Sequence, residues 1–122
     1  MFFEKLIGPK EDFAAYRDEI GVVESQVGLR LSGTNVYVTV VGTLTNRSSV
    51  TWKNVGVEAQ FFDSSGKAFD AITVDADSYR GVVVLPHGVA AFKIEGRAAQ
   101  PDANYTNCRT AVRWAKDAAA WP

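Results

Sequence analysis

The sequence predicts an all-β fold, namely an immunoglobulin-like antiparallel β-sandwich of about seven strands with a short N-terminal helix. From Val22 onward, apolar and polar residues alternate with a period of two, which is typical of strands with one buried face. These segments are rich in β-branched residues, which favour strands. Clusters of Gly, Pro, Asn, Asp and Ser separate them at nearly regular intervals, as hairpin turns require.

A short helix is predicted over 9–20, PKEDFAAYRDEI, ahead of the first strand. Pro9 suits the first turn of a helix, and the acidic residues after it suit the positive end of the helix dipole. The apolar residues that fall on one helical face are Phe13, Tyr16 and Ile20. This face either packs on the sandwich or docks a partner. We therefore divide the chain into an N-terminal extension with the helix, 1–20, and the sandwich, 21–122.

Three strands are predicted in the first half of the sandwich, and each has one apolar face. In the first, over 22–31, the alternating apolar residues are Val23, Val27, Leu29 and Leu31, which indicates a half-buried strand. In the second, over about 36–46, one face holds Val36, Val38, Val40, Gly42 and Leu44. In the third, over 51–62, one face holds Val55, Val57, Ala59 and Phe61.

Four further strands are predicted in the second half. The segment 68–77 places Ile72, Val74 and Ala76 inward, and 79–85 is either a strand or an extended crossover. After a turn at 86–88, the next strand alternates Ala90, Phe92 and Ile94 with polar residues. The last strand, over about 108–116, is expected to hold Cys108, Thr110, Val112 and Trp114 on one side.

Length and charge narrow the class of protein. The 122 residues fit one domain that is large enough to bury a core. The 13 basic and 14 acidic residues give a net charge of -1, which argues against nucleic-acid binding and against attraction to an anionic membrane. No segment approaches the roughly 18 apolar residues of a transmembrane helix. The start, MFFEKLIGPKED, does not read as a signal peptide, although the chain could be a trimmed form.

No residue pattern indicates catalysis or a bound cofactor. Cys108 is the only cysteine, so neither an intrachain disulfide nor a cysteine-based metal cluster is expected. His87, the only histidine, lies in a turn without an evident catalytic or metal-binding partner. A loose acidic set comprises Asp63, Asp70, Asp75 and Asp77. Asp75 and Asp77 could help to hold calcium, but no EF-hand spacing is present, so a solvated strand edge is the favoured interpretation.

Aromatic residues near strand ends and loops are the candidates for a binding surface. They are Trp52, Tyr79, Tyr105 and Trp121. If exposed at one end of the sandwich, they would form a platform for a sugar or a peptide. In the alternative interpretation, Trp52 and Trp114 fill the core and Trp121 packs the C-terminal tail.

Three segments resemble the FxLYD family. Residues 40–48, VVGTLTNRS, are similar to its strand pattern of hydrophobic, Gly, any, hydrophobic, any, Asn, any, Ser. Residues 59–66 are similar to the naming motif, because Asp63 and Gly66 match it, the pair FF replaces Leu-Tyr, and Ala59 replaces the first Phe. Residues 85–92, LPHGVAAF, resemble the family's hydrophobic, Pro, Gly and Phe segment.

The resemblance covers about 36–95 and implies a bacterial or archaeal immunoglobulin-like module without known enzymatic activity. Related sandwich groups are the late-embryogenesis-type and DUF3426-like domains. It also implies an envelope-associated or periplasmic location. If no export segment was removed, a cytoplasmic location is expected instead. The matched residues have structural reasons, since Gly42 avoids crowding a neighbouring strand, Asn46 bonds the backbone of its turn, and Gly66 supplies a positive φ.

From these observations we predict a non-catalytic protein-interaction or ligand-binding module that has no cofactor and no catalytic or metal-ligating residues. A protein partner or a second copy would bind through an edge strand. The alternatives are a purely structural accessory domain of an envelope protein and a carbohydrate- or calcium-binding domain.

Overall fold

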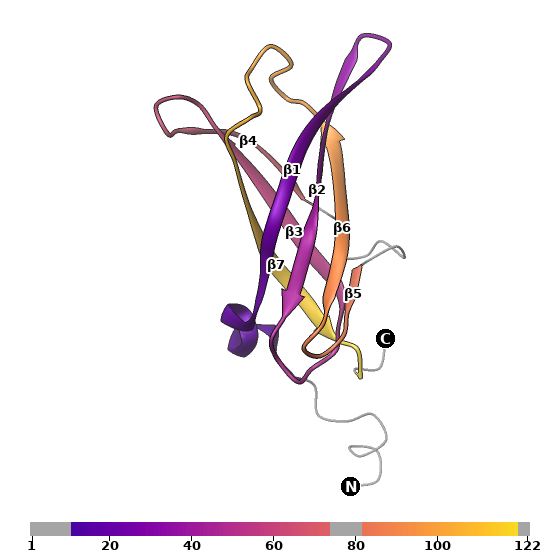
Figure 1. Ribbon diagram of the computed structural model, residues 1–122. Coiled ribbons are helices and arrows are strands. Elements are labelled where there is room, and N and C mark those ends of the chain that lie inside the picture. The colour runs from indigo at the N-terminus through magenta and orange to yellow at the C-terminus, as the bar shows by residue number, and fades with distance from the viewer. Residues whose placement is uncertain (1–10, 74–81, 120–122) are drawn as a thin grey trace, which may run out of the picture.

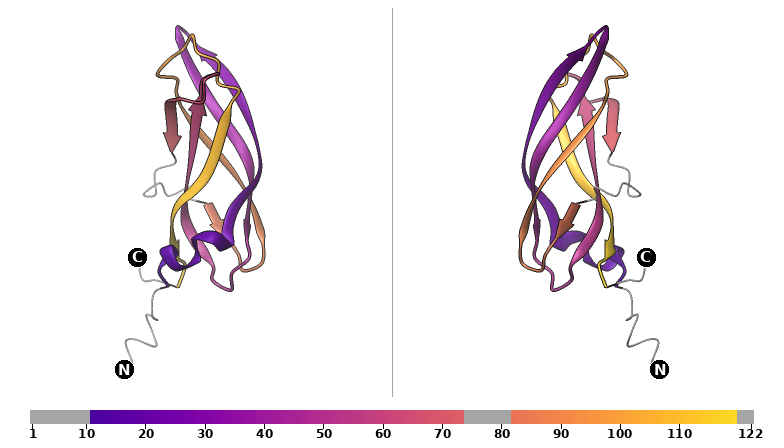
Figure 2. Two further views of the ribbon diagram at one scale, coloured as in Figure 1. Left: turned by 90° about the vertical axis from the view of Figure 1, so that its left-hand side faces the viewer. Right: turned by 90° about the vertical axis from the view of Figure 1, so that its right-hand side faces the viewer.

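The computed structural model describes residues 11–73 and 82–119, and it confirms an all-β sandwich of two antiparallel sheets with one short helix (Figure 1). Views from either side show the two layers of strands facing each other (Figure 2). The elements are η1 (Phe13–Glu19), β1 (Ile20–Ser32), β2 (Asn35–Asn46), β3 (Trp52–Phe62), β4 (Ala68–Thr73), β5 (Val82–Val84), β6 (Val89–Arg97) and β7 (Cys108–Asp117).

The first sheet has the strand order β1-β2-β6, and the second is built around β3. β4 and β5 share one edge of β3, and β7 pairs with the other. The hairpin of β1 and β2 is long, because its pairing runs from Ile20 opposite Asn46 to Ser32 opposite Asn35. In this arrangement β1 is an edge strand of the first sheet.

The predicted helix is a 3-10 helix that is shorter than expected, and its apolar face packs on the sandwich. Asp12 caps it by accepting a backbone N–H with its carboxylate. Phe13 and Tyr16 contact the Trp52 ring edge-on, with centroid distances of 5.7 and 5.5 Å. Phe13 is part of the main hydrophobic cluster, so η1 shares the core of the sandwich. Ile20 is also buried, although it belongs to β1.

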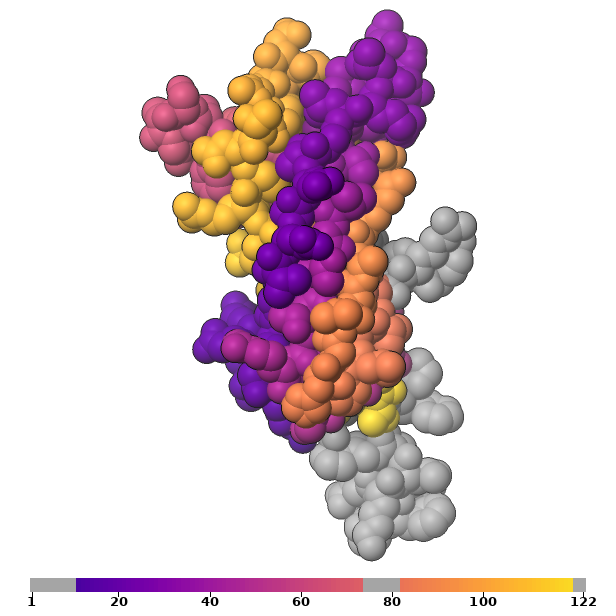
Figure 3. All heavy atoms as spheres, viewed as in Figure 1, coloured from indigo at the N-terminus to yellow at the C-terminus, as the bar shows by residue number. Residues whose placement is uncertain are grey.

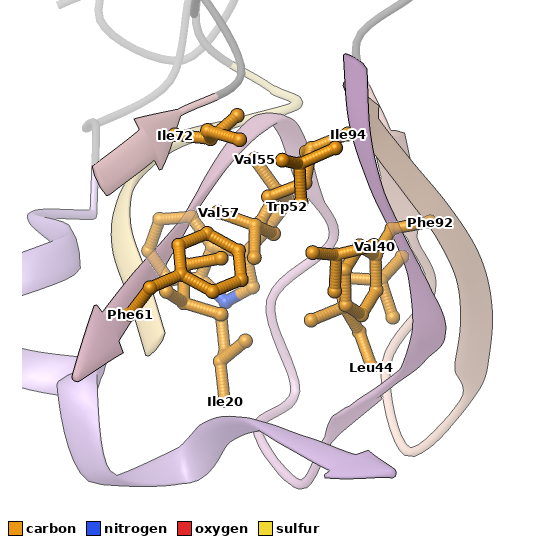
Figure 4. Close-up of a cluster of buried hydrophobic side chains, with 14 of the residues drawn as sticks. Ile20, Val40, Leu44, Trp52, Val55, Val57, Phe61, Ile72, Phe92 and Ile94 are labelled. Carbon is orange, nitrogen blue, oxygen red and sulfur yellow. The ribbon is translucent and has the colours of Figure 1, made fainter. Parts of the chain in front are cut away.

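Side chains from both sheets meet between the layers to form the core (Figure 4). The alternation predicted for β3 is confirmed, since its residues Val55, Val57, Ala59 and Phe61 are all fully buried. The first sheet contributes Val38, Val40, Leu44, Phe92 and Ile94. Ile72 of β4 is inward as predicted, whereas Val74 and Ala76 lie outside the described residues.

The structural role predicted for Gly42 is also confirmed. A Cβ atom at this position would lie 2.7 Å from the Phe92 ring and closer still to the backbone oxygen of Glu24. The absence of a side chain therefore lets Phe92 lie across β2 within the core.

A bulge in β1 makes the predicted alternation wrong near Val23. Val22 pairs with Leu44 and Glu24 pairs with Thr43, so Val23 is an extra residue in β1. The side chain of Val23 is 60% exposed instead of sharing a buried face with Val27. One inserted residue reverses the faces of a strand, and residue types in the sequence do not reveal that insertion.

A second bulge, in β7, makes the predicted position of Trp114 wrong. Val112 pairs with Val57 and Trp114 pairs with Gly56, so Arg113 is the extra residue. Trp114 covers Gly56 instead of joining Val112 in the core, and a Cβ atom on Gly56 would overlap its indole. Arg113 bonds Glu58 on the same outer face. The expectation that Trp114 fills the core is therefore wrong.

Candidate interaction surface

The predicted aromatic platform is wrong for Trp52 and Tyr105, because both are buried. Trp52 is fully buried and Tyr105 is 2% exposed. Tyr105 packs edge-on against the rings of Phe61 and Phe69. Neither ring offers a face to a ligand, whereas Tyr79 and Trp121 lie outside the described residues.

Trp52 belongs to a buried hydrogen-bond network that closes one end of the sandwich. Its indole Nε1 donates to Ser48 Oγ over 3.1 Å, and Ser48 Oγ donates to Asn46 Oδ1 over 2.6 Å. Asn46 Nδ2 donates to the carbonyls of Val50 (2.7 Å) and Leu85 (3.1 Å). The prediction that Asn46 bonds the backbone of its turn is confirmed, and the side chain also reaches the end of β5. The link from Ser48 to Trp52 was not predicted.

At the other end of the sandwich, Tyr105 and Asp70 form a second hydrogen-bond network, which holds the 98–107 loop. The Tyr105 hydroxyl donates to Asp70 Oδ2 over 2.6 Å and accepts a hydrogen bond from the backbone N–H of Gln100. Burial and the bond to Asp70 raise the pKa of Tyr105. Asp70 also accepts the backbone N–H of Ala99, so its carboxylate holds a loop in place.

The other acidic residues considered as calcium ligands form no metal site among the described residues. Asp63 closes its turn by accepting hydrogen bonds from the backbone N–H groups of Ser65 and Lys67. The Ser65 hydroxyl and these backbone groups lower the pKa of Asp63. Gly66 has a φ of +85°, as predicted for this turn. Within 11–73 and 82–119, no three His, Cys, Asp or Glu residues are grouped to hold a metal ion, and Asp75 and Asp77 lie outside these ranges.

His87 and Cys108 are isolated from catalytic partners in the described structure. His87 is exposed in the turn between β5 and β6, where its φ is +57°. Cys108 is partly buried, and burial raises the pKa of its thiol. A raised pKa reduces the fraction of thiolate, the reactive form of cysteine.

A hollow of about 580 Å³ lies between the 63–66 turn and the 98–107 loop. Its lining includes Phe62, Phe69 and the amide side chains of Gln100, Asn104 and Asn107. Aromatic rings and amides suit a sugar, so the carbohydrate-binding alternative would use this hollow. However, its polar groups shape the loops, since Asp63 closes one turn and Asn104 accepts the backbone N–H of Thr106.

The outer edge of β1 pairs with no strand in the described structure. Its exposed apolar side chains are Val23 (60%), Leu29 (60%) and Leu31 (75%). The strand runs uncovered along much of the visible face of the molecule (Figure 3). The prediction of a half-buried strand is therefore wrong for its distal half. Leu29 and Leu31 pair with Val38 and Val36, but near the tip of the hairpin nothing described covers the two leucines.

Two opposite charges flank this apolar edge on the outer face of the first sheet. Arg30 pairs with Glu95, with 2.9 Å between Nη2 and Oε1, and its guanidinium lies 4.6 Å from the centroid of the Tyr37 ring. Thr39 Oγ1 donates to the same carboxylate over 2.6 Å. Glu24 lies near the other end of the strand, where it accepts a long hydrogen bond of 3.4 Å from Thr43.

The Glu95 pair predicts a specific pH dependence. Hydrogen bonds from Arg30 and then from Thr39 lower the pKa of Glu95 to about 2. The carboxyl of an unfolded Glu has a pKa of about 4.3, so this stabilisation is present above that pH and is lost as the pH falls towards 2. We expect Glu95→Gln to flatten the fall in melting temperature between about pH 4.5 and 2. Asp18→Asn, which changes an exposed carboxylate on η1 and leaves the Arg30 pair intact, is the control. An unchanged slope in Glu95→Gln would contradict the assignment.

Comparison with known proteins adds little to this geometry. No family model matches the chain, and no curated protein matches it. One solved structure, the X-ray structure of Northeast Structural Genomics Consortium target SoR45, is similar, with 12% identity and a TM-score of 0.42 over 81% of this chain and 85% of that chain. The FxLYD resemblance stays a prediction. In the part of the chain that the structure describes, no helix has the length and apolar character needed to cross a membrane.

Proposed function

We propose that this chain is a non-catalytic protein-interaction module that binds a partner by adding a strand to β1. The observation that carries this proposal is a 13-residue edge strand whose apolar side chains remain exposed along its distal half. An unpaired edge presents a row of backbone N–H and C=O groups, and an extended segment can satisfy them while its side chains cover the apolar residues.

The composition of β1 supports this proposal. Exposed edge strands in monomeric proteins are commonly protected by Lys, Pro or inward-pointing charges. β1 contains neither Lys nor Pro, and its stretch 25–29, SQVGL, carries no charge. Leu29 and Leu31 are also more than half exposed. A single exposed apolar residue would need no explanation, but these two lie next to each other on one face of β1.

The polar groups elsewhere are used for structure, which favours binding over catalysis. Asn46 and Ser48 bond the turn and Trp52, while Asp70 bonds Tyr105 and a loop backbone. The FxLYD resemblance supports the same class of module. The structural-accessory alternative would leave the edge of β1 without a role.

A matched pair of variants tests the proposal. Leu29→Lys/Leu31→Lys places two charges on the edge of β1, whereas Leu85→Lys/Val89→Lys places two charges at positions that are 64% and 68% exposed elsewhere. In capture from a lysate of the source cells, with quantitative mass spectrometry, we expect the first variant to lose proteins that the wild type and the second variant retain. Equal recovery by both variants, with unchanged melting temperatures, would overturn the proposal.

A further inference from the structure

We infer that β1 pairs with β1 of a second copy of this chain, antiparallel and around a two-fold axis through Val27. This inference rests on the proposed function, because it uses the same edge and names the strand that occupies it. It requires a register in which the two identical strands complement each other.

Symmetry limits the possible registers. In an antiparallel pair, directly opposite side chains lie on the same face of the sheet. When a two-fold axis relates the two strands, residues that lie opposite each other are therefore separated by an even number of positions in the sequence. The axis then lies beside the residue midway between them. Glu24 and Arg30 share the outer face, since they pair with Thr43 and Tyr37, whose neighbours Leu44 and Val38 are buried.

The charges select one of these registers. Glu24 and Arg30 each lie three positions from Val27, so centring on Val27 places Glu24 opposite the partner's Arg30, twice by symmetry. Centring on Glu24 or on Arg30 would oppose like charges. Centring on Gln26 or Gly28 would leave both charges opposite uncharged residues. Opposite charges across strands are favourable and like charges are unfavourable, so the Val27 register is preferred.

The same register also covers the exposed apolar side chains. It places Leu29 beside the partner's Ser25 and brings Leu31 to the level of the partner's Val23, where each strand bulges. These leucines are 60% and 75% exposed in one copy, so pairing removes apolar surface from water. At the axis, Val27 of each copy lies opposite Val27 of the other, on the inner face of the joined sheet.

Arg30 now reaches over β2 to Glu95 of β6, so its guanidinium is directed away from the free edge of β1. Glu95 engages its Nε and Nη2 atoms, and the Tyr37 ring lies under the guanidinium. The side chain is still 52% exposed, and a guanidinium has further N–H donors that can reach a second carboxylate. Pairing therefore requires the guanidinium to turn from Glu95 towards the free edge of β1, where the partner's Glu24 lies opposite in this register.

Charge reversal on the full chain tests the register by sedimentation equilibrium. E24R sets arginine against the partner's Arg30, and R30E sets Glu24 against glutamate. We expect each single variant to raise the dimer dissociation constant roughly tenfold or more, since two cross-strand pairs change sign. The double variant E24R/R30E should recover a large part of the affinity. An equimolar mixture of E24R and R30E should form mixed dimers, because both of its pairs are complementary.

The mixture keeps the test informative even though R30E also loses the pair with Glu95. A folding defect would not be repaired by adding E24R, whereas pairing between the two variants would be. A wild-type chain that stays monomeric up to about 1 mM, which corresponds to roughly 4 kcal/mol of binding free energy, would overturn the inference. So would a dimer that is insensitive to E24R. If the chain is monomeric but Leu29→Lys/Leu31→Lys still loses captured proteins, the proposed function stands and only the self-pairing fails.

Discussion

Replacing Trp52 by Ala is expected to lower the free energy of unfolding by about 3–5 kcal/mol, the typical cost of removing a buried Trp or Phe ring. Trp52 is fully buried, and Phe13 and Tyr16 pack edge-on against its ring. Its indole also bonds Ser48 Oγ. The change would therefore leave a cavity, release η1 from its packing surface and remove a donor from the buried network. Urea unfolding followed by circular dichroism measures the loss.

Trp114→Ala is the matched control for this prediction. Trp114 is half-buried on the outer face, and its Nε1 atom is buried without a hydrogen-bond partner in the described structure. Its removal deletes a ring of the same size without breaking a hydrogen bond. We expect a clearly smaller loss of stability than for Trp52→Ala. Equal losses would show that the two rings contribute alike, contrary to their positions in the structure.

Replacing Asn46 by Ala is expected to cost about 3 kcal/mol, because each buried polar group left unsatisfied costs about 1–3 kcal/mol. Asn46 is 1% exposed. Its amide serves the carbonyls of Val50 and Leu85, and its Oδ1 accepts both the N–H and the hydroxyl of Ser48. Water cannot readily replace these contacts at a buried position. Denaturant unfolding again gives the change in stability.

Two variants separate the Asn46 network from a general effect of removing an amide. Asn104→Ala removes an exposed side chain that bonds only the Thr106 N–H among the described contacts, and a loss below about 1 kcal/mol is expected. Asn46→Asp keeps the acceptor for Ser48 but sets a carboxylate against the two carbonyls, so it should remain destabilising. A stable Asn46→Asp protein would show that the amide donor is dispensable.

Local patterns were sufficient to predict the strands. Neighbouring residues set the alternation of β3, where Val55, Val57, Ala59 and Phe61 all proved to be buried. Turn chemistry likewise placed Asp63 and Gly66, because a positive φ is a local requirement. The roles of Gly42 in strand packing and of Asn46 in its turn were also predicted correctly, although the contacts of Gly42 with Phe92 and of Asn46 with Leu85 were not.

Burial and faces were harder to predict because they depend on distant segments. The bulges at Val23 and Arg113 are visible only in the pairing of two strands, and each reversed a predicted face. Trp52 and Tyr105 were candidates for an exposed platform because they lie near strand ends. The structure buries Trp52 under η1 and Tyr105 among Phe61 and Phe69. An aromatic residue looks the same in the sequence whether it fills a core or covers a surface.

The edge of β1 shows the same division most clearly. Its apolar alternation and its two charges are properties of the sequence, and they were enough to predict a strand. The distal exposure of Leu29 and Leu31 depends on where the opposite sheet ends. The common face of Glu24 and Arg30 depends on the β1–β2 register, including a bulge beside Glu24. Periodicity therefore determined which segments are strands, whereas contacts between residues far apart in the chain decided which of their faces remain available to a partner.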